Sequence, residues 1–105
     1  MEKLTVAASL RGLSAAGTTY ARQMEKAGFD VGLYKPEGSD GQTPHVRDEI
    51  YVIATGTGMF HCAGEGAAFA SGDVFFVPAG TEHRFVDFSA DFSTWVIFLG
   101  ARPKT

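Results

Sequence analysis

The sequence has little cysteine, no excess of basic residues and no long hydrophobic run, and each shortage excludes a class of protein. Its single cysteine, Cys62, cannot form an intramolecular disulfide, which excludes a disulfide-stabilised secreted domain and a cysteine-rich zinc site. There are 9 Lys and Arg residues against 12 Asp and Glu, a net charge of −3, and the basic residues are scattered singly. Phosphate backbones attract clustered positive charge, so we expect no nucleic-acid partner.

Hydrophobic runs near the N-terminus are short. Arg11 interrupts the first apolar stretch after a few residues, which leaves it short of a signal-peptide core and of the roughly 20 residues that span a bilayer. We therefore expect a cytoplasmic protein without a membrane partner. Its 105 residues suffice for one compact domain and are too few for two.

From Phe29 onward the sequence has the rhythm of an all-β domain, because several of its 13 glycines separate short stretches rich in Val, Ile, Phe and Tyr. These stretches predict six strands: Phe29–Tyr34, Glu49–Thr55, Met59–Cys62, Asp73–Val77, His83–Phe88 and Thr94–Leu99. The segments between them carry turn residues, and the polar loop Pro36–Pro44 is expected at the mouth of a barrel.

Residues 1–28 lack this rhythm. We predict that they form an N-terminal segment that packs on the barrel of residues 29–105 or on a partner. Within the segment, Thr18–Lys26 contains several good helix formers between Gly17 and Gly28, and it is the candidate for a short helix.

Two of the predicted strands are apolar on both faces. The runs VFFV (74–77) and WVIFL (95–99) can each turn one face to a barrel interior, but the other face needs a second layer. The N-terminal segment can cover one strand, and a partner subunit is the natural cover for the other. We therefore expect a homodimer. The predicted core residues are Phe75, Phe76, Phe85, Val96 and Phe98.

Two of the three histidines stand where strands can aim them at one point. His45 precedes Glu49 by four positions, and residues of equal parity in an extended strand project to one face, which Thr43 and Tyr51 would share. His83 begins another predicted strand, which can lie beside the first and bring His83 opposite His45.

The turn before His83 is also informative. Pro78 and Gly80 reverse the chain there, and Gly80 is expected to have a positive φ, which a residue with a side chain adopts only with strain. This turn would set the direction of the His83 side chain.

At these residues the sequence resembles the cupin superfamily. The first cupin motif has two histidines one residue apart, a glutamate, six further residues and a glycine; His45, Glu49 and Gly56 match it, and Thr43 takes the place of the first histidine. The second motif has a glycine, a proline, a glycine, a histidine and an asparagine at fixed spacing. Four of its positions match, namely Gly72, Pro78, Gly80 and His83, while Asp87 replaces the asparagine.

The resemblance implies a small antiparallel β-barrel of jelly-roll type, with both motif regions lining one pocket. It also implies that His45, Glu49 and His83 are ligands of a divalent metal ion. Two neutral imidazoles and a carboxylate suit Fe, Mn, Ni or Zn, and they leave positions open for water or substrate. Thr43, Tyr51 and Phe85 are expected to line the pocket beside them.

Plainer interpretations stand beside the metal site. The two histidines can be hydrogen-bonded residues inside the barrel, and Glu49 can form a salt bridge with Arg47 or Arg84. His61 matches no motif position and is expected at the surface or at the edge of the lumen, where it could serve as a general base.

Two functions follow, because a fold does not determine an activity. In the first, the protein binds a divalent metal in the barrel together with a small organic ligand, and it uses the ion as a Lewis acid or to activate O₂. In the second, it is a metal-free module that binds a small molecule or has a structural role, without catalytic activity. The metal content of the purified protein would distinguish them.

Overall fold

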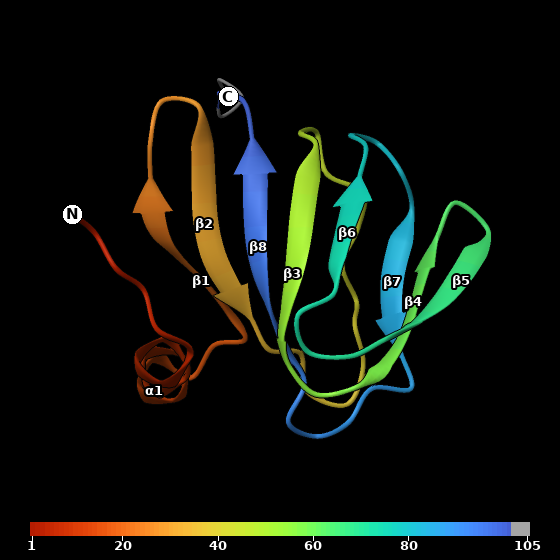
Figure 1. Ribbon diagram of the computed structural model, residues 1–105, viewed down its shortest axis with the longest axis horizontal. Coiled ribbons are helices and arrows are strands. Elements are labelled where there is room, and N and C mark those ends of the chain that lie inside the picture. The colour runs from red at the N-terminus through yellow and green to blue at the C-terminus, as the bar shows by residue number, and fades with distance from the viewer. Residues whose placement is uncertain (102–105) are drawn as a thin grey trace.

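The computed structural model describes residues 1–101. In this part of the chain one helix precedes eight strands (Figure 1). The elements are α1 (Val6–Ala16), β1 (Tyr20–Glu25), β2 (Phe29–Tyr34), β3 (Glu49–Thr55), β4 (Gly58–Cys62), β5 (Glu65–Phe69), β6 (Val74–Val77), β7 (His83–Val86) and β8 (Ser93–Leu99). The six strands predicted from the sequence are confirmed within two residues at each end.

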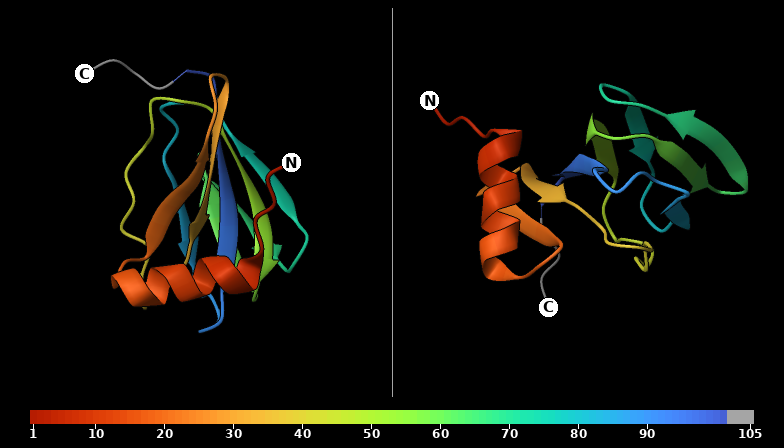
Figure 2. Two further views of the ribbon diagram at one scale, coloured as in Figure 1. Left: turned by 90° about the vertical axis from the view of Figure 1, so that its left-hand side faces the viewer. Right: turned by 90° about the horizontal axis from the view of Figure 1, so that it is seen from below.

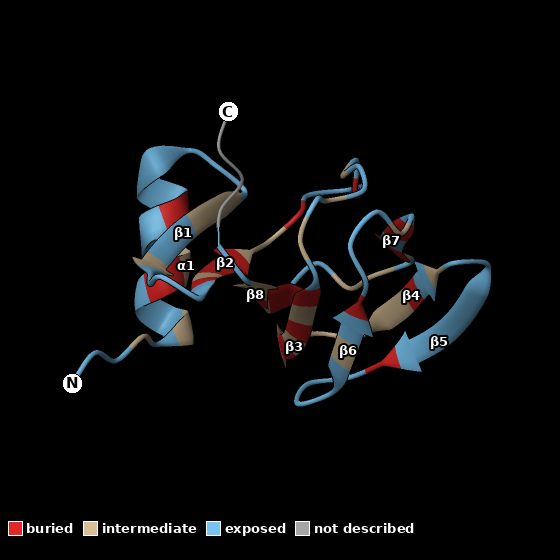
Figure 3. Ribbon diagram, turned by 90° about the horizontal axis from the view of Figure 1, so that it is seen from above, coloured by how far each residue is buried: buried red, intermediate tan, exposed pale blue. Residues whose placement is uncertain are grey.

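The strands form two antiparallel sheets. The larger sheet has the order β1-β2-β8-β3-β6, and the smaller has the order β5-β4-β7. In Figure 1 the larger sheet bends round toward the smaller one, and Figure 3 shows the buried residues concentrated on the strands that face the space between them. This arrangement confirms the predicted all-β jelly-roll class.

Alternation along the central strand β3 explains where the core lies. Glu49, Tyr51 and Ile53 are buried on the inner face, while Ile50 and Val52 are half-buried on the outer face. The inner residues join an aromatic-rich cluster in which Tyr51 contacts the ring of Phe85 edge-to-face, with centroids 4.8 Å apart. The core therefore ends, at the start of β3, on a carboxylate.

The predicted helix at Thr18–Lys26 is wrong, because most of that stretch is β1, paired with β2. The helix lies earlier in the chain, where the Thr5 hydroxyl oxygen accepts a hydrogen bond from the Ala8 amide and Gly17 ends the helix with φ 65°. It lies at the β1–β2 end of the larger sheet, away from the smaller sheet (Figure 2). The N-terminal segment thus contributes one strand to the sheet and one helix beside it.

The strand β5 is absent from the six that the sequence predicts. The tight reversal before it is made by Ala63 and Gly64, with φ of 51° and 83°. Positive φ at both central residues is the geometry of a two-residue hairpin, and it lets β5 pair with β4 immediately after the turn.

The outer face of the edge strand β6 is apolar and uncovered. Val74 is 63% exposed and Phe76 is 56% exposed, so the prediction of Phe76 as a core residue is wrong. The strand alternates, and only Phe75 and Val77 turn inward. Among residues 1–101, no helix has the length and apolar character needed to span a membrane.

Candidate metal centre

Three elements bring the predicted ligands together. His45 lies in the loop between β2 and β3, Glu49 is the first residue of β3, and His83 is the first residue of β7. The amide of Gly80 donates to the His45 carbonyl oxygen at 2.7 Å, so the turn before His83 is fastened to the loop that carries His45. Gly80 has φ 76°, as the sequence predicts.

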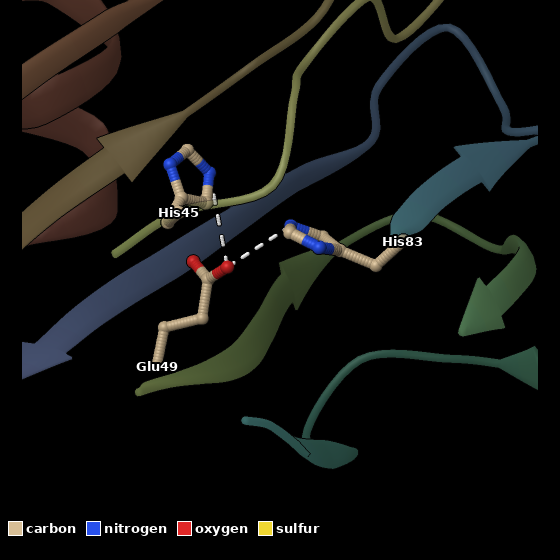
Figure 4. Close-up of side chains that lie close together, drawn as sticks. All are labelled: His45, Glu49 and His83. Atoms are coloured by element: carbon tan, nitrogen blue, oxygen red, sulfur yellow. Dashed lines mark ion pairs between the residues drawn. The ribbon is translucent and has the colours of Figure 1, made fainter. Parts of the chain in front are cut away.

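The side chains converge on the Glu49 carboxylate (Figure 4). The Nε2 atom of His83 lies 2.9 Å from Glu49 Oε1, and the Nε2 atom of His45 lies 3.8 Å from the same oxygen. One donor atom from each of the three residues lies within 4.8 Å of the others. The side chains of Glu49 and His83 are each only 1% exposed, whereas that of His45 is 30% exposed, so the cluster opens to solvent on the His45 side.

Protonation explains why this cluster could hold a cation. The Nδ1 atom of His83 lies 2.8 Å from the Thr81 carbonyl oxygen, which can only accept, so Nδ1 carries a proton. In neutral His83 the Nε2 lone pair then faces Glu49 Oε1, and neither carboxylate oxygen receives a hydrogen bond from the described residues. Two lone pairs at this distance repel, and a buried carboxylate without donors is costly.

A proton on Nε2 is one way to satisfy the cluster. Burial lowers the pKa of His83, but the nearby Glu49 carboxylate and the hydrogen bond to the Thr81 carbonyl outweigh burial, and the net result is a raised pKa. A divalent ion is the other way. Metal–ligand bonds of about 2.0–2.2 Å place neighbouring donor atoms about 3 Å apart and opposite ones about 4.2 Å apart. The 2.9 Å between His83 Nε2 and Glu49 Oε1 matches a neighbouring pair, and the 3.8 Å between His45 Nε2 and the same oxygen lies between the two values.

The residues expected to line the pocket have separate places. Tyr51 is fully buried, and its hydroxyl lies 3.0 Å from His83 Nε2. Phe85 packs in the aromatic core behind Tyr51. Thr43 is exposed, because residues 41–48 form a loop in which strand parity does not apply. The exposed His61 lies outside the cluster.

A cavity of about 180 Å³ adjoins the cluster. Its walls come from β1, β2, β3, β8 and the loop after β2, and they comprise Tyr20, Tyr34, Gln42, His45, Glu49, Val96 and Phe98. The sequence alone does not identify Tyr20, Tyr34 and Gln42 as residues of this cavity. Gly32 is the one signal for Tyr20, because a Cβ atom there would come within 2.8 Å of the Tyr20 ring.

Arg47 forms an ion pair close to the cavity, but its partner is Asp30 and not Glu49. Arg47 donates to Asp30 Oδ2 at 2.9 Å and lies over the Phe98 ring, 4.9 Å from its centroid. The expected alternative of a Glu49–Arg47 salt bridge is therefore not formed. Glu49 pairs with histidines alone among the described residues.

Comparison with known proteins agrees with this arrangement. The sequence pattern of the cupin domain family matches residues 31–94. An uncharacterised protein of Streptomyces coelicolor is 33% identical over 81 residues, which are 75% of this chain and 77% of that protein. The oxalate-binding protein of Thermotoga maritima is 38% identical over 64 residues, which are 61% of this chain and 46% of that protein.

The fold has solved counterparts as well. A cupin 2 conserved barrel domain protein from Salinispora arenicola superposes with a TM-score of 0.65 at 26% identity, covering 78% of this chain and 75% of that one. The motif residues, the sequence match and the two-sheet fold all agree, and the chain therefore belongs to the cupin family.

Proposed function

We propose that this cupin binds a divalent metal ion through His45, Glu49 and His83, and that it takes a small carboxylate ligand in the adjoining cavity. The observation that carries the proposal is the Glu49 carboxylate, which is buried, receives no hydrogen bond from the described residues and faces the Nε2 atoms of two imidazoles. A cation at this point compensates the buried charge and the Nε2 lone pair of neutral His83.

The charge of the site supports an anionic ligand. A divalent ion and one carboxylate leave a net positive charge, and when bound the ion would act as a Lewis acid toward a ligand oxygen. The side chains of Val96 and Phe98 would restrict the cavity and exclude water from it. The partly exposed His45 lies on the side that is open to solvent. A cavity of about 180 Å³ suits a ligand of a few heavy atoms.

A relative supports the choice of carboxylate. The Thermotoga maritima protein that is 38% identical over 64 residues is named an oxalate-binding protein. Oxalate is small, doubly charged and able to place two oxygens on one ion, so we infer that it or a carboxylate of similar size is the ligand here.

The test combines metal analysis with titration of untagged protein. We expect the purified protein to contain, or to bind with micromolar affinity, at least one of Fe(II), Mn(II), Ni(II) and Zn(II). Calorimetry should then show oxalate binding to the metal-loaded protein and none to protein treated with chelator. His83→Ala and His45→Ala should each abolish metal binding, since each removes one of the three ligands.

A metal-free binding module is the second candidate, and the raised pKa of His83 favours it, because a protonated His83 can compensate Glu49 without a metal. In that case the protein binds none of the four ions at micromolar levels, and any oxalate binding is unaffected by chelator. This pair of results would overturn the proposal.

A further inference from the structure

Gln42 reaches the cluster from the position next to the one that the family motif assigns. The motif places Thr43 where a first histidine usually stands, but Thr43 is exposed. The side-chain oxygen of Gln42 lies instead 3.2 Å from His45 Nε2 and 3.0 Å from the Tyr51 hydroxyl oxygen. It is thus an additional oxygen donor at the edge of the candidate metal site.

A buried carboxylate determines which end of the Gln42 amide faces the cluster. The amide nitrogen Nε2 of Gln42 donates to Asp40 Oδ2 at 2.8 Å. Asp40 is itself held by the Tyr34 hydroxyl at 2.6 Å and by the Phe85 backbone amide at 2.9 Å. A reversed amide would set two acceptor oxygens against each other, so Asp40 directs Gln42 Oε1 at the cluster.

Five polar side-chain atoms around the cluster form a closed ring. Glu49 Oε1 is 2.9 Å from His83 Nε2, which is 3.0 Å from the Tyr51 hydroxyl oxygen. That oxygen is 3.0 Å from Gln42 Oε1, which is 3.2 Å from His45 Nε2, and His45 Nε2 is 3.8 Å from Glu49 Oε1. Three of these distances join candidate ligand atoms directly: 2.9 Å and 3.2 Å are close to the roughly 3 Å between neighbouring ligands of one ion, and the third is 3.8 Å.

Tyr51 differs from the other four members of the ring. Its phenolic hydroxyl is a hydrogen-bond donor, placed 3.0 Å from both His83 Nε2 and Gln42 Oε1. It has one proton to give, either to His83 Nε2 or to Gln42 Oε1. When the His83 lone pair is used by a metal, that proton goes to Gln42 and orients the amide oxygen from a second side.

We propose that Gln42 Oε1 is a fourth protein ligand of the divalent ion, aimed at it by Asp40 and Tyr51. The proposal rests on the function proposed above. The ligand set would then be two imidazole nitrogens, one carboxylate oxygen and one amide oxygen. Carbonyl oxygens suit Mn(II) better than imidazole does, whereas imidazole favours Ni(II) and Zn(II). Gln42 would therefore shift the metal preference of the site toward Mn(II).

The experiment compares three variants of the full chain. Gln42→Leu removes the oxygen at nearly constant size, Gln42→His supplies an imidazole, and Thr43→Val is the matched control on the exposed neighbour. Mn(II) affinity is measured by the electron paramagnetic resonance of free Mn(II), and the number of Mn(II)-bound waters by water-proton relaxation. Circular dichroism in the presence of chelator establishes that each variant is folded.

We expect Gln42→Leu to weaken Mn(II) binding about 10- to 100-fold and to add one bound water, with Thr43→Val unchanged. Gln42→His should raise the affinity for Ni(II) relative to Mn(II), which provides an independent test if the leucine variant does not fold. The added water separates a lost ligand from a mere misplacement of His45, which would weaken binding without opening a position.

Failure of this inference and failure of the proposed function look different. If the wild-type protein binds metal, and Gln42→Leu binds Mn(II) as tightly with the same number of waters, Gln42 is not a ligand and the three-residue site stands. An unchanged ratio of Ni(II) to Mn(II) affinity in Gln42→His would also overturn the assignment. If the wild-type protein binds none of the ions, both proposals are wrong.

Discussion

Asp40 and Glu49 are carboxylates of nearly equal burial, 3% and 1% exposed, in opposite situations. Asp40 accepts four hydrogen bonds from its surroundings: from the Tyr34 hydroxyl, from the backbone and side-chain nitrogens of Gln42, and from the Phe85 amide. Glu49 accepts none of good geometry from the described residues and faces histidine nitrogens instead.

The difference separates a structural group from a functional one. Burial of a charge is tolerated when fixed dipoles replace its hydration, and Asp40 has such dipoles from three directions. Glu49 lacks them, so a proton on His83 Nε2 or a divalent ion could compensate its charge. A group left unsatisfied by its own chain indicates where a partner binds.

Removing Asp40 should have the largest effect on stability. Asp40→Ala leaves a hydroxyl, two backbone amides and a side-chain amide without their acceptor inside the protein. We expect the free energy of unfolding of the metal-free protein to fall by about 3–5 kcal/mol in urea titrations. Asp48→Ala is the control: Asp48 is exposed and accepts one hydrogen bond from Ala79, and its loss should cost about 1 kcal/mol or less.

Glu49→Gln should behave in the opposite way. At mildly alkaline pH the metal-free variant should unfold within about 1 kcal/mol of the wild type, because the change removes a buried charge and supplies an amide donor for His83 Nε2. Its metal affinity should fall at least about tenfold in the same titrations used above. A loss of stability as large as that of Asp40→Ala would show that Glu49 is structural.

The third prediction concerns pH and has a definite sign. The pKa of His83 is raised above 6.5 in the folded state, so its pairing with Glu49 stabilises the metal-free protein fully below pH 6.5. This stabilisation is lost as pH rises through the raised pKa. His83→Gln should lack the loss, which urea titrations with chelator at several pH values can establish.

Metal should reverse that trend, because only neutral imidazoles bind it. The additional stability in saturating Ni(II) should grow as pH rises through the pKa of His83. If the metal-free wild type instead gained stability relative to His83→Gln over that interval, Glu49 and His83 would not form the pair seen here.

The comparison also explains how much of the fold could be predicted from sequence. Six of the seven strands described from Phe29 onward were predictable because alternation and turn residues are local signals. Residues Thr18–Lys26 were not, since good helix formers there are overruled by pairing with β2, a contact that no local window contains. The helix that does form depends on the Thr5 cap, on Gly17 and on its place beside the sheet.

The candidate site divides in the same way. His45, Glu49 and His83 could be identified because their spacing matches the two motifs and the glycine turn before His83 is visible in a short stretch of sequence, although His45 lies in a loop and not on a strand. Gln42 could not, because its orientation comes from Asp40, which is anchored to β7 through the Phe85 amide. Strand parity selected Thr43, but residues 41–48 form a loop and not a strand, and Thr43 is exposed.

Apolar side chains can be compared in the same way, by whether the chain itself covers them. A substitution at an uncovered one is expected to change the stability of the single chain least. Phe85 is covered by the core, whereas Phe76 and Val74 on the outer face of β6 are not. These exposed side chains would be buried if an apolar surface of another molecule packed against them. We propose that a second copy supplies it, because the edge strand of a two-fold dimer can cover its own symmetry mate with the same residues.

Phe76→Ser tests this proposal without touching the metal site, since the side chain lies on the face of the sheet opposite to Glu49. Light scattering at micromolar concentration should give twice the monomer mass for the wild type and the monomer mass for the variant. Metal affinity should be unchanged, and the intrinsic stability of the chain should change by only about 0.5 kcal/mol. Val46→Ser, which removes a 75% exposed apolar side chain from a loop, should leave the mass doubled. A wild type that is monomeric, or a Phe76→Ser variant that is still dimeric, would show that this face is not where two copies meet.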